Sequence, residues 1–81
     1  MLLGWFHPPV PVKTIEGDVR HDISHVQAAR EQLLQWTQRG PKWYLAAYAC
    51  LDAIDAQGSP HEVRKAFIEA AKEEGMLLPD L

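Results

Sequence analysis

The sequence is poor in cysteine and has no long apolar run. Its only cysteine is Cys50, so no disulfide can form within the chain. This excludes the disulfide framework of small secreted domains and makes a reducing cytoplasm the expected compartment. No stretch approaches the roughly 18 apolar residues of a membrane-spanning helix. Residues 1–9 have no basic stretch and too short an apolar run for a signal peptide, so we expect a cytoplasmic protein.

The chain also lacks an excess of positive charge. Eight Lys and Arg residues stand against eleven Asp and Glu residues, a formal net charge of −3. This is the wrong sign for a general nucleic-acid-binding protein. The charge is uneven: residues 30–42 hold three bases and one acid, whereas residues 52–74 hold six acids and three bases. Opposite charges at two ends of a surface can help subunits dock.

Apolar residues are not scarce. They make up 47% of the 81 residues, which excludes a disordered chain, and the length predicts a single domain spanning 1–81. In so short a chain, the burial of apolar area barely offsets the conformational entropy of folding. We therefore expect the large aromatic side chains to lie in the core or to be shared with a second subunit.

The first 23 residues predict an arm followed by a hairpin. Residues 1–9 contain Trp5 and Phe6, which we expect to lie across the core and close it; the alternative is insertion into a partner. Residues 10–23 alternate between apolar and polar side chains, with Gly17-Asp18 placed as a two-residue turn. That turn predicts Thr14 opposite His21 and Val12 opposite Ile23, with Pro11 on an edge.

Three helices are predicted in the rest of the chain, at 24–39, 41–57 and 60–74, followed by a tail at 75–81. Ser24 with Gln27 matches a capping box for the first helix, and Gly40 is predicted to end it in a left-handed conformation. A serine cap, a proline and a glutamate at 59–62 mark the start of the third helix. The predicted fold class is α+β, in the order ββααα, with Met76-Leu77-Leu78 as a candidate for a short third strand.

The second predicted helix is apolar on nearly every side. A helix with this pattern is expected to be buried, which would make it the centre of the fold. We predict that large side chains of this region belong to the core, namely Trp36, Leu45, Cys50, Leu51 and Ile54.

The chain resembles the family of small bacterial proteins named domain of unknown function 982, found mainly in soil- and plant-associated bacteria. The resemblance spans nearly the whole chain and implies a small cytosolic bacterial protein without an established activity. The segment Thr37-Gln38-Arg39 stands where the family has a proline soon after the tryptophan. The resemblance is carried by Trp5-Phe6, Pro9-Val10, Val12, Ala29, Leu33-Leu34, Trp36, Gly40, Ala49-Cys50-Leu51, Ala53, Ala66-Phe67, Ala70-Ala71 and Gly75.

Few residues suggest catalysis or metal binding. Cys50 lies in the most apolar helix, where burial raises the pKa of a thiol and makes it inert. A metal site using His21, Asp22 and His25 is an alternative, although the predicted change from strand to helix at Ser24 separates the two histidines. The sequence predicts no catalytic residue, no metal and no cofactor.

Two pairs of acidic residues are candidates for an acid–base site. The pairs Asp52/Asp55 and Glu73/Glu74 are expected to be solvated, because nothing in the sequence encloses them. The five glycines stand singly, so no phosphate-binding loop is present.

The corner around Gly40-Pro41 is the predicted contact surface. Arg39, Lys42, Trp43 and Tyr44 place cations beside aromatic rings there. A weak nucleic-acid-binding regulator acting through the Arg39–Lys42 turn is an alternative, since helix-turn-helix is the outline of a DNA-binding motif. The following helix offers almost no side chain that could recognise a base edge.

The sequence therefore favours a non-enzymatic protein that acts through protein contacts. The partner is unknown, and a second copy in a homodimer is one candidate. The reason is a surplus of apolar residues for so small a chain.

Overall fold

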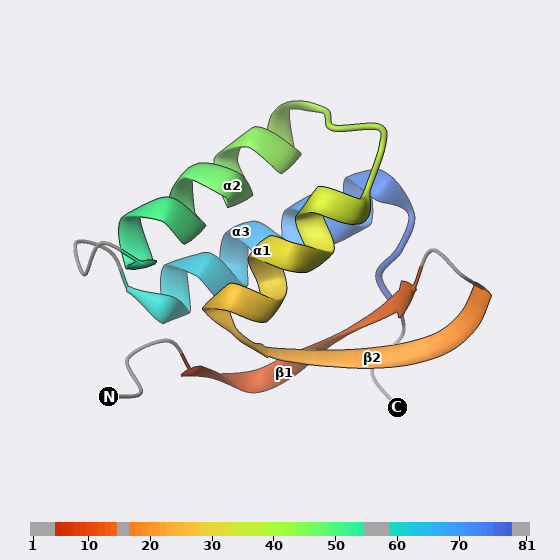
Figure 1. Ribbon diagram of the computed structural model, residues 1–81, viewed down its shortest axis with the longest axis horizontal. Helices are drawn as coiled ribbons and strands as arrows, with labels where there is room; N and C mark the ends of the chain where they lie inside the picture. Colours follow the sequence, from red (N-terminus) through yellow and green to blue (C-terminus); the bar gives the residue numbers. More distant parts are fainter. Residues whose placement is uncertain (1–4, 15–16, 55–58, 79–81) are drawn as a thin grey trace.

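The structure is a computed structural model that describes residues 5–14, 17–54 and 59–78. A hairpin is followed by three helices, so the predicted α+β class and the ββααα order are confirmed. The elements are β1 (Trp5–Thr14), β2 (Gly17–His25), α1 (Val26–Gln35), α2 (Pro41–Ile54) and α3 (Pro60–Glu74) (Figure 1).

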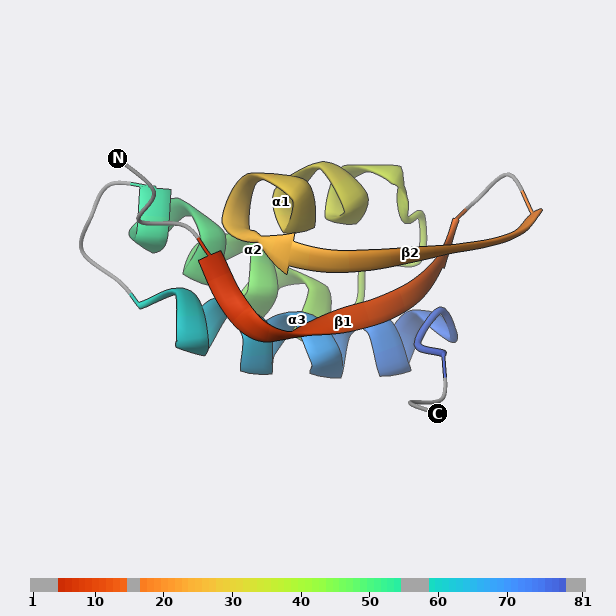
Figure 2. The ribbon, with the colours of Figure 1, turned by 90° about the horizontal axis from the view of Figure 1, so that it is seen from below.

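The elements form three layers. The hairpin covers one side of the pair α1 and α3, with β2 packed on α1 and β1 packed on α3. Helix α2 packs on α3 and α1 from the side away from the hairpin (Figures 1 and 2). The core lies between the hairpin and the α1–α3 pair and extends to the inner side of α2, which contributes Trp43, Ala46 and Cys50. Helix α2 is nevertheless an outer helix, because no described element covers its other side.

The two strands pair in a register two residues away from the predicted one. Val10 lies opposite Ile23, Val12 lies opposite His21, and Gly17 pairs with Thr14. Gly17 therefore belongs to β2, and the predicted turn at Gly17-Asp18 is wrong. A shift of two residues leaves every side chain on its original face. Val10, Val12 and Ile23 are accordingly buried together, which is why the apolar pattern did not distinguish the two registers.

The outer edge of β1 is paired with the tail. The Lys13 amide donates to the Met76 carbonyl at 2.9 Å, and the Leu78 amide donates to the Pro11 carbonyl at 3.0 Å. Since Pro11 directs its carbonyl toward the tail, its nitrogen also faces away from β2, and no hairpin hydrogen bond is lost. Leu77 forms an isolated antiparallel bridge with Val12 and not a third strand.

Helix α1 is shorter than predicted at both ends. Strand β2 continues through Ser24, and the N-cap is His25, whose Nδ1 accepts a hydrogen bond from the Gln27 amide at 3.2 Å. The helix ends at Gln35, and Trp36 is already extended. Trp36 leaves the helix because its side chain enters the core, where it is fully buried and stacked on Phe67 with ring centroids 5.3 Å apart.

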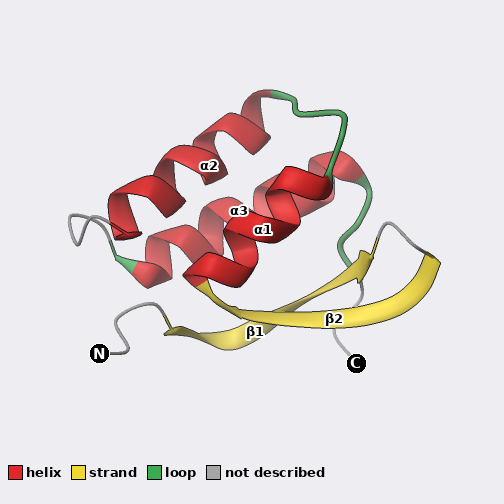
Figure 3. Ribbon diagram, viewed as in Figure 1, coloured by secondary structure: helices red, strands yellow, loops and turns green. Residues whose placement is uncertain are grey.

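In the loop between α1 and α2, drawn in green in Figure 3, the left-handed residue is Arg39 rather than Gly40. Arg39 has the left-handed φ of 48° that the sequence pattern assigned to Gly40. Gly40 has a different environment: a Cβ there would lie 2.7 Å from the carboxylate of Glu73 in α3, and this side chain would have to shift.

Helix α3 has its predicted bounds. The Ser59 hydroxyl accepts from the His61 amide at 3.1 Å, and Pro60 follows the cap. Gly75 ends the helix with a φ of 74°. Helix α2 begins at Pro41 as predicted, whereas its predicted end at 57 lies outside the described residues.

Residues 5–9 of the predicted N-terminal arm are part of β1, whereas residues 1–4 lie outside the described residues. Phe6 is buried in the core. Trp5 is half exposed and packs edge-on against the His25 ring at 4.8 Å. Arg64 of α3 fastens this strand, since its Nε donates to the Pro8 carbonyl at 2.8 Å.

Candidate functional site

Helix α2 is only partly buried, and its predicted place at the centre of the fold is wrong. Its buried residues are Trp43, Ala46 and Cys50, which lie on the side that meets α1 and α3. Leu45, Leu51 and Ile54, predicted as core, are between 44% and 58% exposed. The two other helices cover one side of α2, and none of the described elements covers the opposite side.

The exposed residues of α2 form a continuous apolar surface together with one residue of α1. Tyr48 is the most exposed of them, at 63%. Tyr44 and Tyr48 are four residues apart and Leu51 follows three residues later, which places them on one stripe of the helix. We call this surface the apolar face; it consists of Leu34, Tyr44, Leu45, Tyr48, Leu51 and Ile54.

Most of the apolar face lies within a run of nine consecutive uncharged residues in α2. From Trp43 to Leu51 every residue is uncharged, with Lys42 before the segment and Asp52 after it. Both of these flanking side chains are exposed. Tyrosine is typical of interface centres and charged residues of their rims, so this distribution resembles a protein interface more than an ordinary solvated helix.

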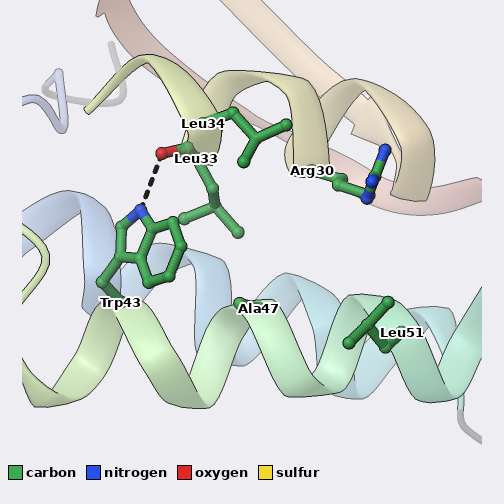
Figure 4. A pocket seen from close by; sticks show the side chains of 6 residues that line it. All are labelled: Arg30, Leu33, Leu34, Trp43, Ala47 and Leu51. Carbon is green, nitrogen blue, oxygen red and sulfur yellow. Dashed lines mark hydrogen bonds between the residues drawn. The ribbon is translucent and has the colours of Figure 1, made fainter. Parts of the chain in front are cut away.

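A groove runs between α1 and α2 beside the apolar face. Its volume is about 200 Å³, and its lining is almost entirely apolar (Figure 4). Ala47 contributes a small side chain on the α2 side, and the indole of Trp43 closes one end. The groove is lined by Arg30, Leu33, Leu34, Trp43, Ala47 and Leu51.

The four residues predicted as a contact surface meet at the α1–α2 corner, where they have different environments. Trp43 is buried, and its Nε1 donates to the Leu33 carbonyl at 2.7 Å (Figure 4). Arg39 donates from Nε to the Trp36 carbonyl and from an Nη to the Leu34 carbonyl, both at 3.0 Å, and its guanidinium lies 4.7 Å from the Trp43 ring centre. Arg39 and Trp43 thus hold the corner together.

Arg39, Lys42 and Tyr44 are the exposed members of that set. Tyr44 lies edge-on against Trp43, with ring centroids 5.2 Å apart, and half of its surface is exposed. Tyr44 continues the apolar face toward the N-terminus of α2, and Lys42 lies near that end of the helix.

The carboxylate pair at the end of α3 shapes the same corner and is not simply solvated. Glu74 is buried, and its carboxylate accepts from the Arg39 amide at 2.8 Å and from the Gln38 amide at 3.3 Å. Glu73 accepts from the Lys42 amide at 3.1 Å, at the positive end of the α2 dipole. Glu74 therefore provides acceptors for a loop that has no regular structure, and Glu73 provides one for the first turn of α2.

The alternative metal ligands are dispersed. Asp22 pairs with Arg20 at 2.9 Å, and His25 is used as the cap of α1. His21 and Asp22 are consecutive in a strand and point to opposite faces. Among residues 5–14, 17–54 and 59–78, no three His, Cys, Asp or Glu side chains gather as metal ligands.

Cys50 has the environment expected of an inert thiol. It is fully buried, with its Sγ 4.0 Å from the Val26 carbonyl. Desolvation raises the pKa of Cys50 to about 11, an effect that the charge of Arg30 partly opposes. Because this pKa lies above the unfolded value of 9.0, the contribution of the buried thiol to stability is present at neutral pH. It is lost as the pH rises from 9 through 11.

Alkylation should report this burial. At pH 8, native protein treated with iodoacetamide should react at Cys50 about a hundredfold more slowly than protein unfolded in guanidinium, since a pKa two units higher leaves about a hundredth of the thiolate. Mass spectrometry of timed samples measures both rates. Equal rates in the two samples would contradict the buried position of the thiol.

Comparison with family models gives one match, to the family described as protein of unknown function (DUF982), over residues 8–78. The chain belongs to this family. The match covers nearly the whole chain, including most of β1, all of β2, all three helices and the residues of the apolar face. Searches of curated proteins and of solved structures give no match. None of the described helices is long and apolar enough to cross a membrane.

Sequence reasoning did not identify most of the apolar face. Leu45, Leu51 and Ile54 were predicted to lie in the core, and Leu34 was named only among the residues that carry the family resemblance. The distribution of alanines provides a usable signal: Ala46, Ala49 and Ala53 mark the side where a neighbouring helix comes close. The large residues on the other side of α2 are then the exposed ones.

Proposed function

We propose that this protein is a non-enzymatic interaction module that binds a second copy of itself through the apolar face. The observation that carries the proposal is the exposure of six large apolar side chains, five of them on one helix. A soluble chain of this size gains nothing in its own fold from leaving them in water. Contact with another protein surface would bury them.

The size of the apolar face supports a partner that is itself a protein. Six large side chains, each about half exposed, present on the order of 500 Å² of apolar surface. One side of a standard protein interface buries roughly 800 Å². The apolar face with its polar margin is therefore on the scale of one complete interface, and it exceeds what a small ligand in the groove would cover.

The partner proposed is a second copy because the surface is complementary to itself. The two tyrosines combine apolar rings with hydroxyl groups that tolerate a wet margin, and the charges that flank the face have opposite signs. An isologous contact needs both properties, since each copy presents the same residues to the other.

Sedimentation equilibrium from micromolar to millimolar concentration tests the proposal. Wild-type protein should form a reversible dimer, and Tyr48→Glu should remain monomeric, since it would place a carboxylate at the centre of the contact. The matched control is His21→Glu, which adds the same charge at an exposed position on the hairpin, on the opposite side of the molecule; it should dimerise as the wild type does. A wild-type monomer at millimolar concentration overturns the proposal.

A further inference from the structure

The groove between α1 and α2 has an apolar lining with a single cation at one end. Arg30 lies at that end, and the indole of Trp43 closes the other (Figure 4). The remaining lining residues are three leucines and one alanine, so the lining contains no acidic side chain. The charge of the groove is therefore positive and confined to the Arg30 end.

The guanidinium of Arg30 is available to an anion. Its side chain is exposed, and among the residues that the structure describes it takes part in no ion pair. Burial raises the pKa of Cys50 and the charge of Arg30 opposes this rise, as expected of a guanidinium close to the contact between α1 and α2. A guanidinium presents its N–H donors in a planar fork that binds a carboxylate through two parallel hydrogen bonds.

The Trp43 end of the groove is suited to an apolar group. The only polar atom of this side chain, Nε1, already donates to the Leu33 carbonyl at 2.7 Å. The groove has a volume of about 200 Å³. Since an apolar cavity of about 150 Å³ takes one benzene ring, this volume suits an alkyl chain of about eight carbons. Trp43, Ala47 and Leu51 follow one another at intervals of four residues and extend over about 12 Å of α2, so the groove is elongated.

We propose that the α1–α2 groove binds a free carboxylate that carries one apolar chain of about eight carbons. The carboxylate pairs with Arg30, and the chain lies along Ala47 toward Trp43. Burial of the chain supplies most of the affinity, and the cation at the exposed end selects an anionic head group over a neutral one. The groove forms within a single copy, so this inference does not depend on the proposed function.

Titration with octanoate and with octan-1-ol tests the proposal, because the two probes share the chain and differ in the head group. The indole N–H resonance of Trp43 reports binding in the groove. Arg30→Gln should weaken octanoate binding about fivefold at low salt and leave octan-1-ol binding unchanged, since only octanoate loses an ion pair. The matched control is Lys65→Gln, which removes the same charge from an exposed position on α3 and should affect neither probe.

A second variant locates the chain of the ligand. Ala47→Leu fills the groove with a side chain that helices favour, so it should abolish binding of both probes while its thermal melt shows a folded protein. The inference is wrong if Ala47→Leu binds octanoate as the wild type does. It is also wrong if Arg30→Gln weakens both probes equally, or if Lys65→Gln weakens octanoate binding as much as Arg30→Gln does.

The same titration on Tyr48→Glu separates the groove from self-association. Tyr48 does not line the groove, so this variant should bind octanoate as tightly as the wild type. Loss of octanoate binding in Tyr48→Glu would mean that the site needs a second copy, and this would overturn the inference. A wild-type protein that is monomeric but binds octanoate through Arg30 would overturn only the proposed function, so the two failures are distinguishable.

Discussion

Replacing Phe67 with alanine should lower the free energy of unfolding by about 3–5 kcal/mol. Phe67 is fully buried in α3, and its ring stacks on Trp36 at an interplanar angle of 15°. The substitution deletes a ring that is shielded from water and leaves a cavity. Trp36 cannot fill this cavity without leaving its own position. Since small domains have a total stability of only roughly 5 kcal/mol or little more, this variant should be largely unfolded at 37 °C.

The matched control for Phe67→Ala is Leu45→Ala. Leu45 is 58% exposed on the apolar face, so its truncation should change stability by no more than about 0.5 kcal/mol. Urea unfolding followed by circular dichroism measures both, at a protein concentration low enough to keep the chain monomeric. A loss of several kcal/mol for Leu45→Ala in the monomer would mean that α2 is buried and that the layer arrangement described above is wrong.

Replacing Glu74 with alanine should have the second largest effect, a loss of about 2–4 kcal/mol. The carboxylate accepts hydrogen bonds from two backbone amides, those of Gln38 and Arg39, in the loop between α1 and α2. Without it, two partly buried donors lose their partner, and each such donor costs about 1–3 kcal/mol. Because Arg39 adopts a left-handed conformation, the loop also loses the contact that holds it in a strained form.

Two neighbouring variants separate the causes of this loss. Glu74→Gln keeps one acceptor oxygen and removes the charge, so it should lose about half as much as the alanine variant. Glu73→Ala should lose about 1 kcal/mol, because Glu73 is less buried than Glu74 and its hydrogen bond from the Lys42 amide is exposed. Thermal unfolding ranks the three variants by stability. The amide resonance of Arg39 should shift only in the two Glu74 variants. Equal losses for Glu73→Ala and Glu74→Ala would contradict the structural role assigned to Glu74.

Several features of this fold could be predicted from local sequence because local interactions determine them. Helix α3 has its predicted bounds since Ser59, Pro60 and Gly75 act within one turn of the helix ends. The faces of the hairpin were predictable because the period of a strand is two residues. The register was not, since two registers that differ by two residues bury the same side chains.

The candidate site depended on contacts between residues far apart in the chain. Gln38 and Arg39 are joined to Glu74 across 36 and 35 residues, and no local pattern predicts which glutamate will be buried. Local sequence also did not predict that Arg39 would be the left-handed residue of the loop, because contacts with distant residues determine the shape of the loop. Gly40 lies where the Glu73 carboxylate approaches the backbone of the loop.

By itself, the sequence of this protein determined the fold class, the order of the elements, the ends of α3 and the inert character of Cys50. Each of these follows from composition or from interactions within a few residues. Only the tertiary structure decided that α2 is an outer helix and that Tyr44, Leu45, Tyr48 and Leu51 face solvent. The physical reason is that hydrophobicity measures how strongly a side chain favours burial, whereas the packing of α1 and α3 determines which of the many apolar side chains can be buried.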